Sequence, residues 1–504
     1  MEPLDETRVP VVVATGQSID RDSSVSALDL AQQAADIALD AAGGLRRSVQ
    51  LVSMVNVLGG EGPAPGAELA ARTGLSPART EVGTIGGNSP QWLLTRAASA
   101  IAEGRVDTVL VVGGEAQHSA RARALGAPPS APPSVGADPD QQAGGVPDAV
   151  VGDDRVGVGP AELNAGLLAP VHVYALFDSV HAARAGRTPE EHRRALGALM
   201  APFTTVAAGN PYAWFPESRT ARELVDIGPD NRLVAEPYPK RLCAVMHVNQ
   251  GAAVVVTSLA AARAAGLADA AVFCWSGADA TDVWFPTARP DPGASPGLRA
   301  AAGAALDAAG LGVDDVGAFD VYSCFPSVVT MAVEALGISG RDGRGLTVTG
   351  GLPYFGGPGN DYSLHAVASM VEHLRGAGGT GLVSALGWYA TKHAVGVYGA
   401  TPPPGGWRRA DTTAAQRAID ASARPVAEGI DAADGAAPAV VVASTVAYAR
   451  DGSVSAAPVI ARLRDGRHIA AAAVAGELPA LAGRFLVGED VTVTGTPPHY
   501  TLGA

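Results

Sequence analysis

Cysteine is scarce in this sequence. Its 504 residues include only Cys243, Cys274 and Cys324, which lie far apart and form no CxxC pair. An odd number of widely spaced cysteines argues against a disulfide framework and against a zinc site, and it is typical of proteins from a reducing compartment. We therefore expect a cytoplasmic protein without a metal.

Runs of basic residues and long apolar runs are also missing. The formal net charge is −14, whereas nucleic-acid binding needs clustered Lys and Arg to neutralise phosphates. The first ten residues contain neither a positive segment nor an apolar one, unlike a signal peptide. No stretch of about 18 or more apolar residues predicts a membrane span. These absences argue against nucleic acid as a partner and against a membrane-spanning protein.

The chain is too long for one hydrophobic core, so we expect several structural units. Apolar, β-branched segments at 9–15, 51–58 and 108–112 are typical of buried strands, and residues 26–42 and 91–103 have helical spacing. This alternation of strands and helices predicts a mostly parallel α/β sheet.

The second half of the chain repeats the first. The sequence ALDAAG occurs at 38–43 and again at 305–310. A Gly-rich turn, a helical segment and an apolar segment at 350–386 follow the same order as those at 84–112. This order of elements indicates an internal duplication of an α/β unit.

The last part of the chain has an all-β pattern. Asp451-Gly452 and Asp465-Gly466 lie between short β-like segments and are typical hairpin turns. About five short strands in such a meander predict a small, OB-like barrel. The predicted boundaries are 1–258 for the first half, with an excursion at about 120–240, 259–400 for the second half, 401–435 for a linker and 436–504 for the β domain.

Four segments resemble the thiolase superfamily, especially its sterol-carrier-protein branch. They are SPQWLLTRAASAIAEGRVDTVLVVGGEA, HVNQGAAVVVTS, GAFDVYSCFPSVV and TGGLPYFGGPGNDYSLHAVASMVEHLR. With its β domain, the whole chain is similar to the bacterial thiolase-like proteins of type 1, which are acetyl-CoA acetyltransferase-like. The resemblance implies a duplicated thiolase fold of two βαβαβαββ halves, a coenzyme A thioester as substrate or ligand, and a role in lipid metabolism.

The catalytic groups of that family are absent here. Gly87 stands in the position of the nucleophilic cysteine, and Gly357, in Gly356-Gly357-Pro358, replaces the histidine of the GHP motif. Tyr322 stands where the family has Asn or His, and Leu386-Gly387 lies in place of the second cysteine. Without a thiolate at position 87, we expect no cysteine-linked acyl-enzyme.

Other polar side chains occupy the segments that line the family's pocket. Tyr322 would act as a general acid or base if its pKa, near ~10 when unperturbed, were tuned. His365 opens a helix, where the helix dipole favours a neutral imidazole. Alternatively, His365 packs against the Gly-rich loop, and Ser89 is an N-cap. The candidate catalytic residues are Tyr322, His365, Tyr362 and His393, and the candidate substrate-binding residues are Gly87, Asn88, Ser89, Gly356, Gly357, Asn360 and Trp388.

Two functional hypotheses remain. The first is an enzyme that acts on CoA thioesters without a cysteine intermediate, by acyl transfer or by aldol or retro-aldol chemistry with Tyr322 as the base. The second is a non-catalytic acyl-CoA-binding scaffold. Hydroxyl and imidazole groups in the pocket segments favour an enzyme. Thiolases are usually dimers, but the excursion and the extra domain could block that interface, so a homodimer and a monomer both remain open.

Overall fold

Strands from both halves of the chain form one sheet in the computed structural model, which describes residues 4–22, 24–60, 62, 64–75, 78–126, 148–431 and 435–503. Among these residues the sheet has eleven strands, in the order β10-β11-β12-β9-β1-β8-β4-β2-β3-β5, with β13 beside β9. The strands are β1 (Pro10–Ile19), β2 (Leu51–Met54), β3 (Arg79–Gly83), β4 (Thr108–Ala116), β5 (Ala149–Val151), β8 (Asn249–Ser258), β9 (Val272–Thr281), β10 (Ala318–Asp320), β11 (Thr380–Gly387), β12 (Lys392–Gly399) and β13 (Arg408–Arg409).

The sheet is mixed, which corrects the prediction of a mostly parallel one. β2 runs parallel to β3 and β4, and β10 runs parallel to β11. The central pairs β1–β8, β4–β8, β11–β12 and β9–β12 are antiparallel. The reason is local for β11 and β12, because the four residues between them are too few for the crossover that parallel strands need.

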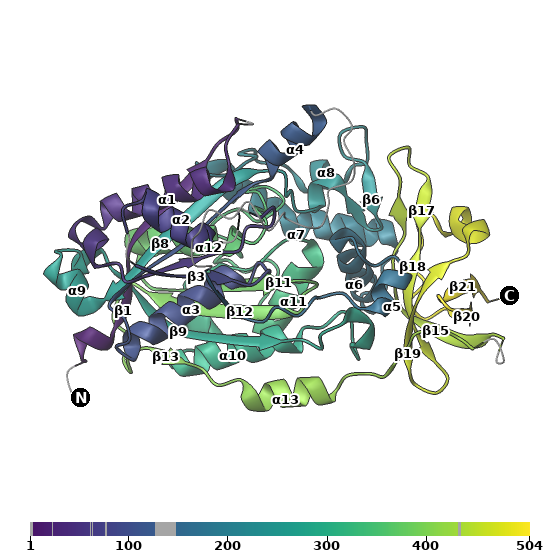
Figure 1. Ribbon diagram of the computed structural model, residues 1–504. Coiled ribbons are helices and arrows are strands. Elements are labelled where there is room, and N and C mark those ends of the chain that lie inside the picture. The colour runs from purple at the N-terminus through teal and green to yellow at the C-terminus, as the bar shows by residue number, and fades with distance from the viewer. Residues whose placement is uncertain are drawn as a thin grey trace, which may run out of the picture.

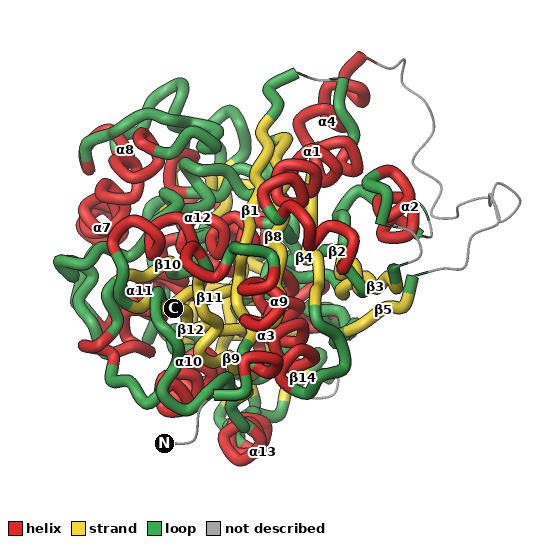
Figure 2. The backbone as a smooth tube through the Cα atoms, turned by 90° about the vertical axis from the view of Figure 1, so that its left-hand side faces the viewer, coloured by secondary structure: helices red, strands yellow, loops and turns green. Residues whose placement is uncertain are grey.

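Helices cover both faces of the sheet and also separate its two halves (Figure 2). α1 (Ala27–Ala41) packs on β1, β4 and β8, whereas α10 (Pro296–Ala309) packs on β9 and β12. Between these halves lie α3 (Ser89–Ala102) and α12 (Tyr362–Ala377), which contact each other and strands of both halves. This layered arrangement places the N-terminal ends of α3 and α12 together and confirms the predicted duplicated α/β fold.

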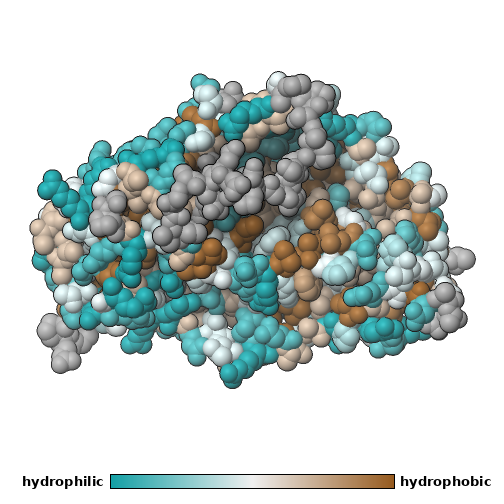
Figure 3. Space-filling view, viewed as in Figure 1, coloured by the Kyte–Doolittle hydropathy of each residue, from teal (hydrophilic) through white to brown (hydrophobic). Residues whose placement is uncertain are grey.

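Further helices of the body come mainly from the excursion and the second half. They are α2 (Pro65–Arg72), α4 (Gln117–Gly126), α5 (Pro160–Asn164), α6 (Pro170–Arg184), α7 (Pro189–Gly209), α8 (Ala221–Val225), α9 (Leu259–Ala264) and α11 (Pro326–Leu336). No helix in the described ranges is both long and apolar enough to cross a membrane. Hydrophobic residues gather near the middle of the face shown in Figure 3, with hydrophilic residues over most of the rest.

The C-terminal part forms a closed five-stranded barrel with its own core, seen at the right of Figure 1. Pairing of β19 with β21 closes the barrel, and the predicted Asp465-Gly466 turn joins β18 to β19. The barrel strands are β15 (Ala437–Ser444), β18 (Pro458–Leu463), β19 (His468–Ala473), β20 (Asp490–Thr494) and β21 (His499–Leu502), and β14 (Val426–Ala427) pairs with β19 from outside.

The barrel is joined to the body by a shared sheet. The other predicted hairpin, at Asp451-Gly452, connects β16 (Ala447–Tyr448) and β17 (Val454–Ala456). β16 also pairs with β6 (Leu233–Ala235), and β6 in turn pairs with β7 (Tyr238–Pro239); both of these strands belong to the first half. The stretch at 401–435 carries α13 (Thr413–Ala421), which packs along α10 below the body in Figure 1.

Candidate active site

A largely apolar cavity of about 480 Å³ lies beside the turn at 85–88 that precedes α3. Its wall includes five predicted site residues, which come from both halves of the chain. These are Gly87, Tyr322, Gly357, Asn360 and Trp388. The duplication therefore brings together residues up to three hundred positions apart, as the sequence pattern predicted.

The hydroxyl of Tyr322 fills the space that a side chain at position 87 would need. A Cβ atom added to Gly87 would lie 2.2 Å from the Tyr322 Oη and 2.7 Å from the backbone oxygen of Leu386. Tyr322 follows β10, is 6% exposed and packs edge-on against the ring of Tyr362. Its hydroxyl forms no hydrogen bond with any described residue, so it is free to bind a ligand in the cavity.

The titratable groups among the described residues of this cavity wall are all uncharged near neutral pH. Burial raises the pKa of the Tyr322 phenol well above its usual value and does the same for Tyr174. Burial also raises the pKa of Cys243 and of Cys324 to about 12, so neither thiol is a ready nucleophile. Tyr322 is therefore a hydrogen-bond donor in the resting protein rather than an ionised base.

Three polar side chains from the second half hold the backbone of the 85–88 turn. Asn360 Oδ1 accepts the N–H of Gly86 at 2.9 Å, and Ser363 Oγ donates to the oxygen of Gly87 at 2.6 Å. Lys392 Nζ donates to the oxygen of Ile85 at 2.6 Å. The N–H of Gly87 has no hydrogen-bond partner in the described part of the chain, which leaves it available as a donor at the helix end.

Tyr362 and His365 lie outside the cavity, which corrects the expectation for Tyr362 and, of the two alternatives for His365, favours packing over a place in the cavity. Both side chains are fully buried, and both rings pack against Phe355. His365 Nδ1 lies 2.8 Å from Gln17 Oε1, and burial lowers the pKa of His365 to about 3. The physical reason is that positions three apart on a helix share one face, and this face of α12 points into the core.

His393 belongs to the start of α10 instead of the cavity. Its Nε2 atom lies 2.9 Å from Asp282 Oδ2 and 3.1 Å from Ser295 Oγ, and Ser295 is the N-cap of α10. Asp282 Oδ1 accepts the N–H of Gly297 in the same helix turn. This network is a buried cap, and a single ring nitrogen serves both oxygens, unlike a catalytic triad, which uses both ring nitrogens.

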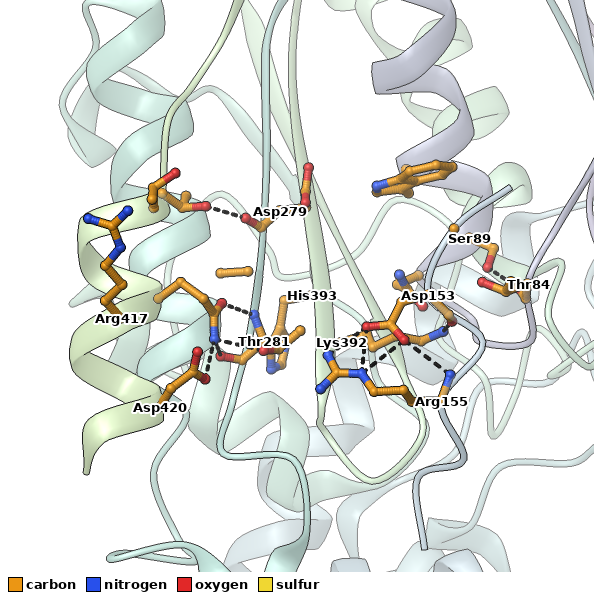
Figure 4. Close-up of a pocket in the computed structure, with 17 residues that line it drawn as sticks. Thr84, Ser89, Asp153, Arg155, Asp279, Thr281, Lys392, His393, Arg417 and Asp420 are labelled. Carbon is orange, nitrogen blue, oxygen red and sulfur yellow. Dashed lines mark hydrogen bonds and ion pairs between the residues drawn. The ribbon is translucent and has the colours of Figure 1, made fainter. Parts of the chain in front are cut away.

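A second cavity, of about 450 Å³, lies on the other side of the 85–88 turn. Figure 4 shows Lys392, Asp153 and Arg155 on one side and Arg417 and Asp420 of α13 on the other. Burial lowers the pKa of Lys392 to about 8. The predicted residues Asn88, Ser89 and His393 line this second cavity, so the turn divides the predicted site into two.

Two of the remaining predicted positions, Ser89 and Gly356, have structural roles. The Ser89 hydroxyl donates to the oxygen of Thr84 and does not cap α3. Gly356 has a φ of 114°, and an added Cβ would lie 2.5 Å from Gln250 Oε1. Gly357 differs, because a Cβ there would have no atom closer than 3.4 Å.

Tyr174 is a cavity residue that sequence reasoning missed. Its hydroxyl donates to the oxygen of Trp388 at 2.7 Å and accepts the N–H of Ala390 at 3.1 Å. Trp388 and Ala390 have φ values of 55° and 51°, which are unfavourable for residues other than glycine. Tyr174 lies on an apolar helix with no local motif, so only the tertiary contact identifies it as the group that holds this turn.

Comparisons with known proteins reveal similar folds. Protein-family models and curated proteins give no match to the chain. A monomeric SCP2-thiolase like protein type 1 from Mycobacterium smegmatis is 31% identical over 99% of both chains, with a TM-score of 0.83. The Ltp2-ChsH2(DUF35) aldolase is 22% identical, covering 78% of this chain and 97% of that one, with a TM-score of 0.60. The acetyl-CoA acetyltransferase from Syntrophomonas wolfei is 18% identical, covering 78% of this chain and 99% of that one, with a TM-score of 0.58.

Proposed function

Since this chain belongs to the SCP2-thiolase-like proteins of type 1, we propose that it binds a CoA thioester beside Tyr322 and makes or breaks a carbon–carbon bond there. The observation that carries the proposal is the Tyr322 hydroxyl, which is unpaired among the described residues and occupies the space above Gly87. A phenol takes the place of a thiol, so a hydrogen-bond donor replaces a nucleophile. The activity would belong to acyl-CoA and lipid metabolism.

The proposed reaction is a retro-aldol cleavage, or its reverse, of a 3-hydroxyacyl-CoA. The β-hydroxyl proton passes to the Tyr322 oxygen, the Cα–Cβ bond breaks, and Cβ leaves as a carbonyl. The electron pair moves onto the thioester oxygen, where the N–H of Gly87 stabilises the enolate. Tyr322 delivers its own proton to Cα in the same concerted step, so its oxygen never carries two protons and the enolate charge on the thioester oxygen is transient. The phenol stays neutral overall, which agrees with its raised pKa better than the ionised base considered from the sequence.

Acyl transfer is supported less well. Direct condensation of two thioesters needs a base to remove a proton from a carbon atom. Among the described residues of the cavity wall, the titratable groups are tyrosines and cysteines with raised pKa values. The same observation favours a second candidate function, a binding protein for CoA thioesters that performs no chemistry.

A panel of acyl-CoAs and 3-hydroxyacyl-CoAs, read by calorimetry and by mass spectrometry of products, tests the proposal. Tyr322→Phe should lower turnover at least about tenfold, since a positioned acid or base contributes about 10²–10⁴. Tyr354→Phe is the matched control, because the buried Tyr354 hydroxyl has no partner in the described residues and lies outside the cavity wall. Cys324→Ala should stay within about threefold, because a small buried thiol is replaced by a similar side chain.

The outcomes separate the candidates. Turnover that falls in Tyr322→Phe alone supports the enzyme. Binding of a CoA thioester without turnover supports the non-catalytic binding protein. If the protein neither binds nor converts any of these thioesters, both candidate functions are contradicted. Turnover that is lost in Cys324→Ala and kept in Tyr322→Phe would contradict a mechanism based on the phenol.

We also propose that the protein is a monomer. β5 pairs with β3 and is the edge strand on that side of the sheet; it has only three residues, and very short edge strands are poor templates for pairing with another chain. The similar protein from Mycobacterium smegmatis is described as monomeric. Light scattering should give the chain mass of 50.6 kDa, and twice that mass would overturn the proposal.

A further inference from the structure

A third cavity, of about 550 Å³, lies where α6 ends, between α7 and the segment at 339–341. Its wall shares no residue with the cavity around Tyr322. Three arginines, Arg184, Arg187 and Arg341, line it together with two buried histidines, and Glu334 is the only carboxylate among its described lining residues. In a protein with a net charge of −14 this is a local excess of positive charge.

The first histidine, His181, is positively charged. Its Nδ1 atom lies 3.1 Å from Asp178 Oδ1 and its Nε2 atom lies 2.7 Å from the oxygen of Gly293. Both ring nitrogens face acceptors, so both must carry protons. Burial opposes this charge, but Asp178 raises the pKa of His181 above its usual value. Burial alone would also raise the pKa of Asp178, yet its two histidine partners keep it well below the usual range.

The second histidine, His192, has one partner and one unused nitrogen. Its Nε2 atom donates to Asp178 Oδ1 at 3.0 Å. Its Nδ1 atom is buried and has no hydrogen-bond partner within the described ranges, although the side chain lines the cavity. Buried polar atoms in folded proteins nearly always have a partner. The free nitrogen, supported from behind by Asp178, therefore points to a ligand that supplies one.

We propose that this cavity binds a phosphate group, either free or as a small monoester. Arg187 and Arg341 are exposed and form no ion pair among the described residues, so their guanidinium groups are available to an anion, whereas Arg184 already pairs with Asp291. Guanidinium groups bind phosphate in two-pronged hydrogen bonds.

The chemistry of His192 also fits phosphate. A phosphate has several oxygens for donors on different sides of a cavity, and its second pKa is about 6. Near neutral pH part of it therefore carries a P–OH group, which can donate a hydrogen bond to His192 Nδ1. Glu334 can accept a hydrogen bond from the hydroxyl of a monoester. The cavity is larger than inorganic phosphate alone requires, which leaves room for such an ester.

Calorimetry of the full chain with inorganic phosphate, and separately with glycerol 3-phosphate, tests this proposal in phosphate-free buffer. We expect one saturable site in the wild type. The double variant Arg187→Ala/Arg341→Ala should bind at least about tenfold more weakly, because charge-assisted hydrogen bonds are the strong ones. His192→Gln keeps an amide near the Nε2 position for Asp178 and removes Nδ1, and we expect a similar loss.

Arg222→Ala is the matched control, since Arg222 lies on α8 with its side chain 87% exposed and outside the cavity wall. The affinity of this variant for phosphate should stay within about twofold of the wild type, well below the tenfold loss expected of the double variant, which corresponds to about 1.4 kcal/mol. Tighter binding of glycerol 3-phosphate than of phosphate identifies a monoester as the ligand, and the reverse identifies the free anion. The proposal is overturned if the wild type shows no saturation at millimolar concentrations, or if Arg222→Ala weakens binding as much as the double variant.

Discussion

Alanine at position 87 gives the most direct test of the geometry around Tyr322. The new methyl group would lie 2.2 Å from Tyr322 Oη, 2.7 Å from the oxygen of Leu386 and 2.9 Å from Tyr322 Cζ. Carbon atoms in contact normally lie about 3.5–4.0 Å from their neighbours, so the ring and β11 must move. Overpacking of this kind typically costs about 1–3 kcal/mol, and we expect Gly87→Ala to lower the free energy of unfolding by about 2 kcal/mol.

A double-mutant cycle identifies the hydroxyl as the cause. In the Tyr322→Phe background, Gly87→Ala meets no atom at 2.2 Å, although the ring carbon and Leu386 remain close. The cost of the alanine should therefore fall by about 1 kcal/mol, within the usual range for residues in direct contact. Urea unfolding of the four proteins, followed by circular dichroism at one pH, measures this coupling.

Gly357→Ala is the matched control at another glycine of the cavity wall. Neither glycine has a positive φ, and the nearest atoms to a Cβ at position 357 lie 3.4 Å away. This variant should be neutral or more stable by about 0.4–1 kcal/mol, because alanine restricts the unfolded chain. Gly87→Ala with unchanged stability, or an equal cost in both backgrounds, would refute the assignment of the Tyr322 hydroxyl to this space. Acylation of a Gly87→Cys variant by acetyl-CoA would refute it as well.

Three further measurements follow from the buried titratable groups. Acetyl-CoA or acetoacetyl-CoA should leave no adduct in intact-mass spectra, since burial raises the pKa of Cys324 to about 12; a stoichiometric adduct would contradict this. The pKa of Lys392 is about 8 in the folded protein and near 10.4 when unfolded. From pH 8 to 10 the free energy of unfolding of the wild type should therefore rise relative to that of Lys392→Met. Equal pH slopes of the unfolding free energy in the two proteins would count against a buried ammonium. The pKa of His365 is about 3, below its unfolded value of about 6.5. Below pH 6.5 the free energy of unfolding should therefore fall with acidification more steeply in the wild type than in His365→Gln. Parallel curves of unfolding free energy against pH would place His365 in solvent.

Local patterns predicted most of the fold. The duplicated strand and helix order, the helix before Gly104 and both Asp-Gly hairpins occur as the sequence indicated. These features depend on contacts between near neighbours in the chain. The pairing of β16 with β6 was not predictable in this way, because it joins residues more than two hundred positions apart in two different units.

The same distinction applies to the site. Gly87 and Tyr322 were each recognised as replacements from the sequence. The sequence did not predict that the tyrosine hydroxyl fills the space above the glycine, because this depends on a contact between two segments far apart in the chain. Helical spacing alone could not decide which side of α12 carries Tyr362 and His365 into the core. Two aromatic or imidazole rings one turn apart are compatible with a pocket wall and with a packed face, and Phe355 decides for the packed face.

The side chains around the 85–88 turn indicate what the fold preserves. Asn360, Ser363 and Lys392 each bind a backbone atom of that turn, although no cysteine remains at Gly87 for them to position. Burying an ammonium is costly, as the lowered pKa of Lys392 reflects. The buried N–H and C=O groups of the turn need hydrogen-bond partners in any case, but a neutral side chain could supply them without the cost of burying an ammonium. The polar contacts fix the backbone of the turn, and under the proposed function the N–H of Gly87 is the backbone group that the turn would present to a thioester. A backbone donor that is fixed in this way favours an enzyme that stabilises an enolate over a non-catalytic binding protein.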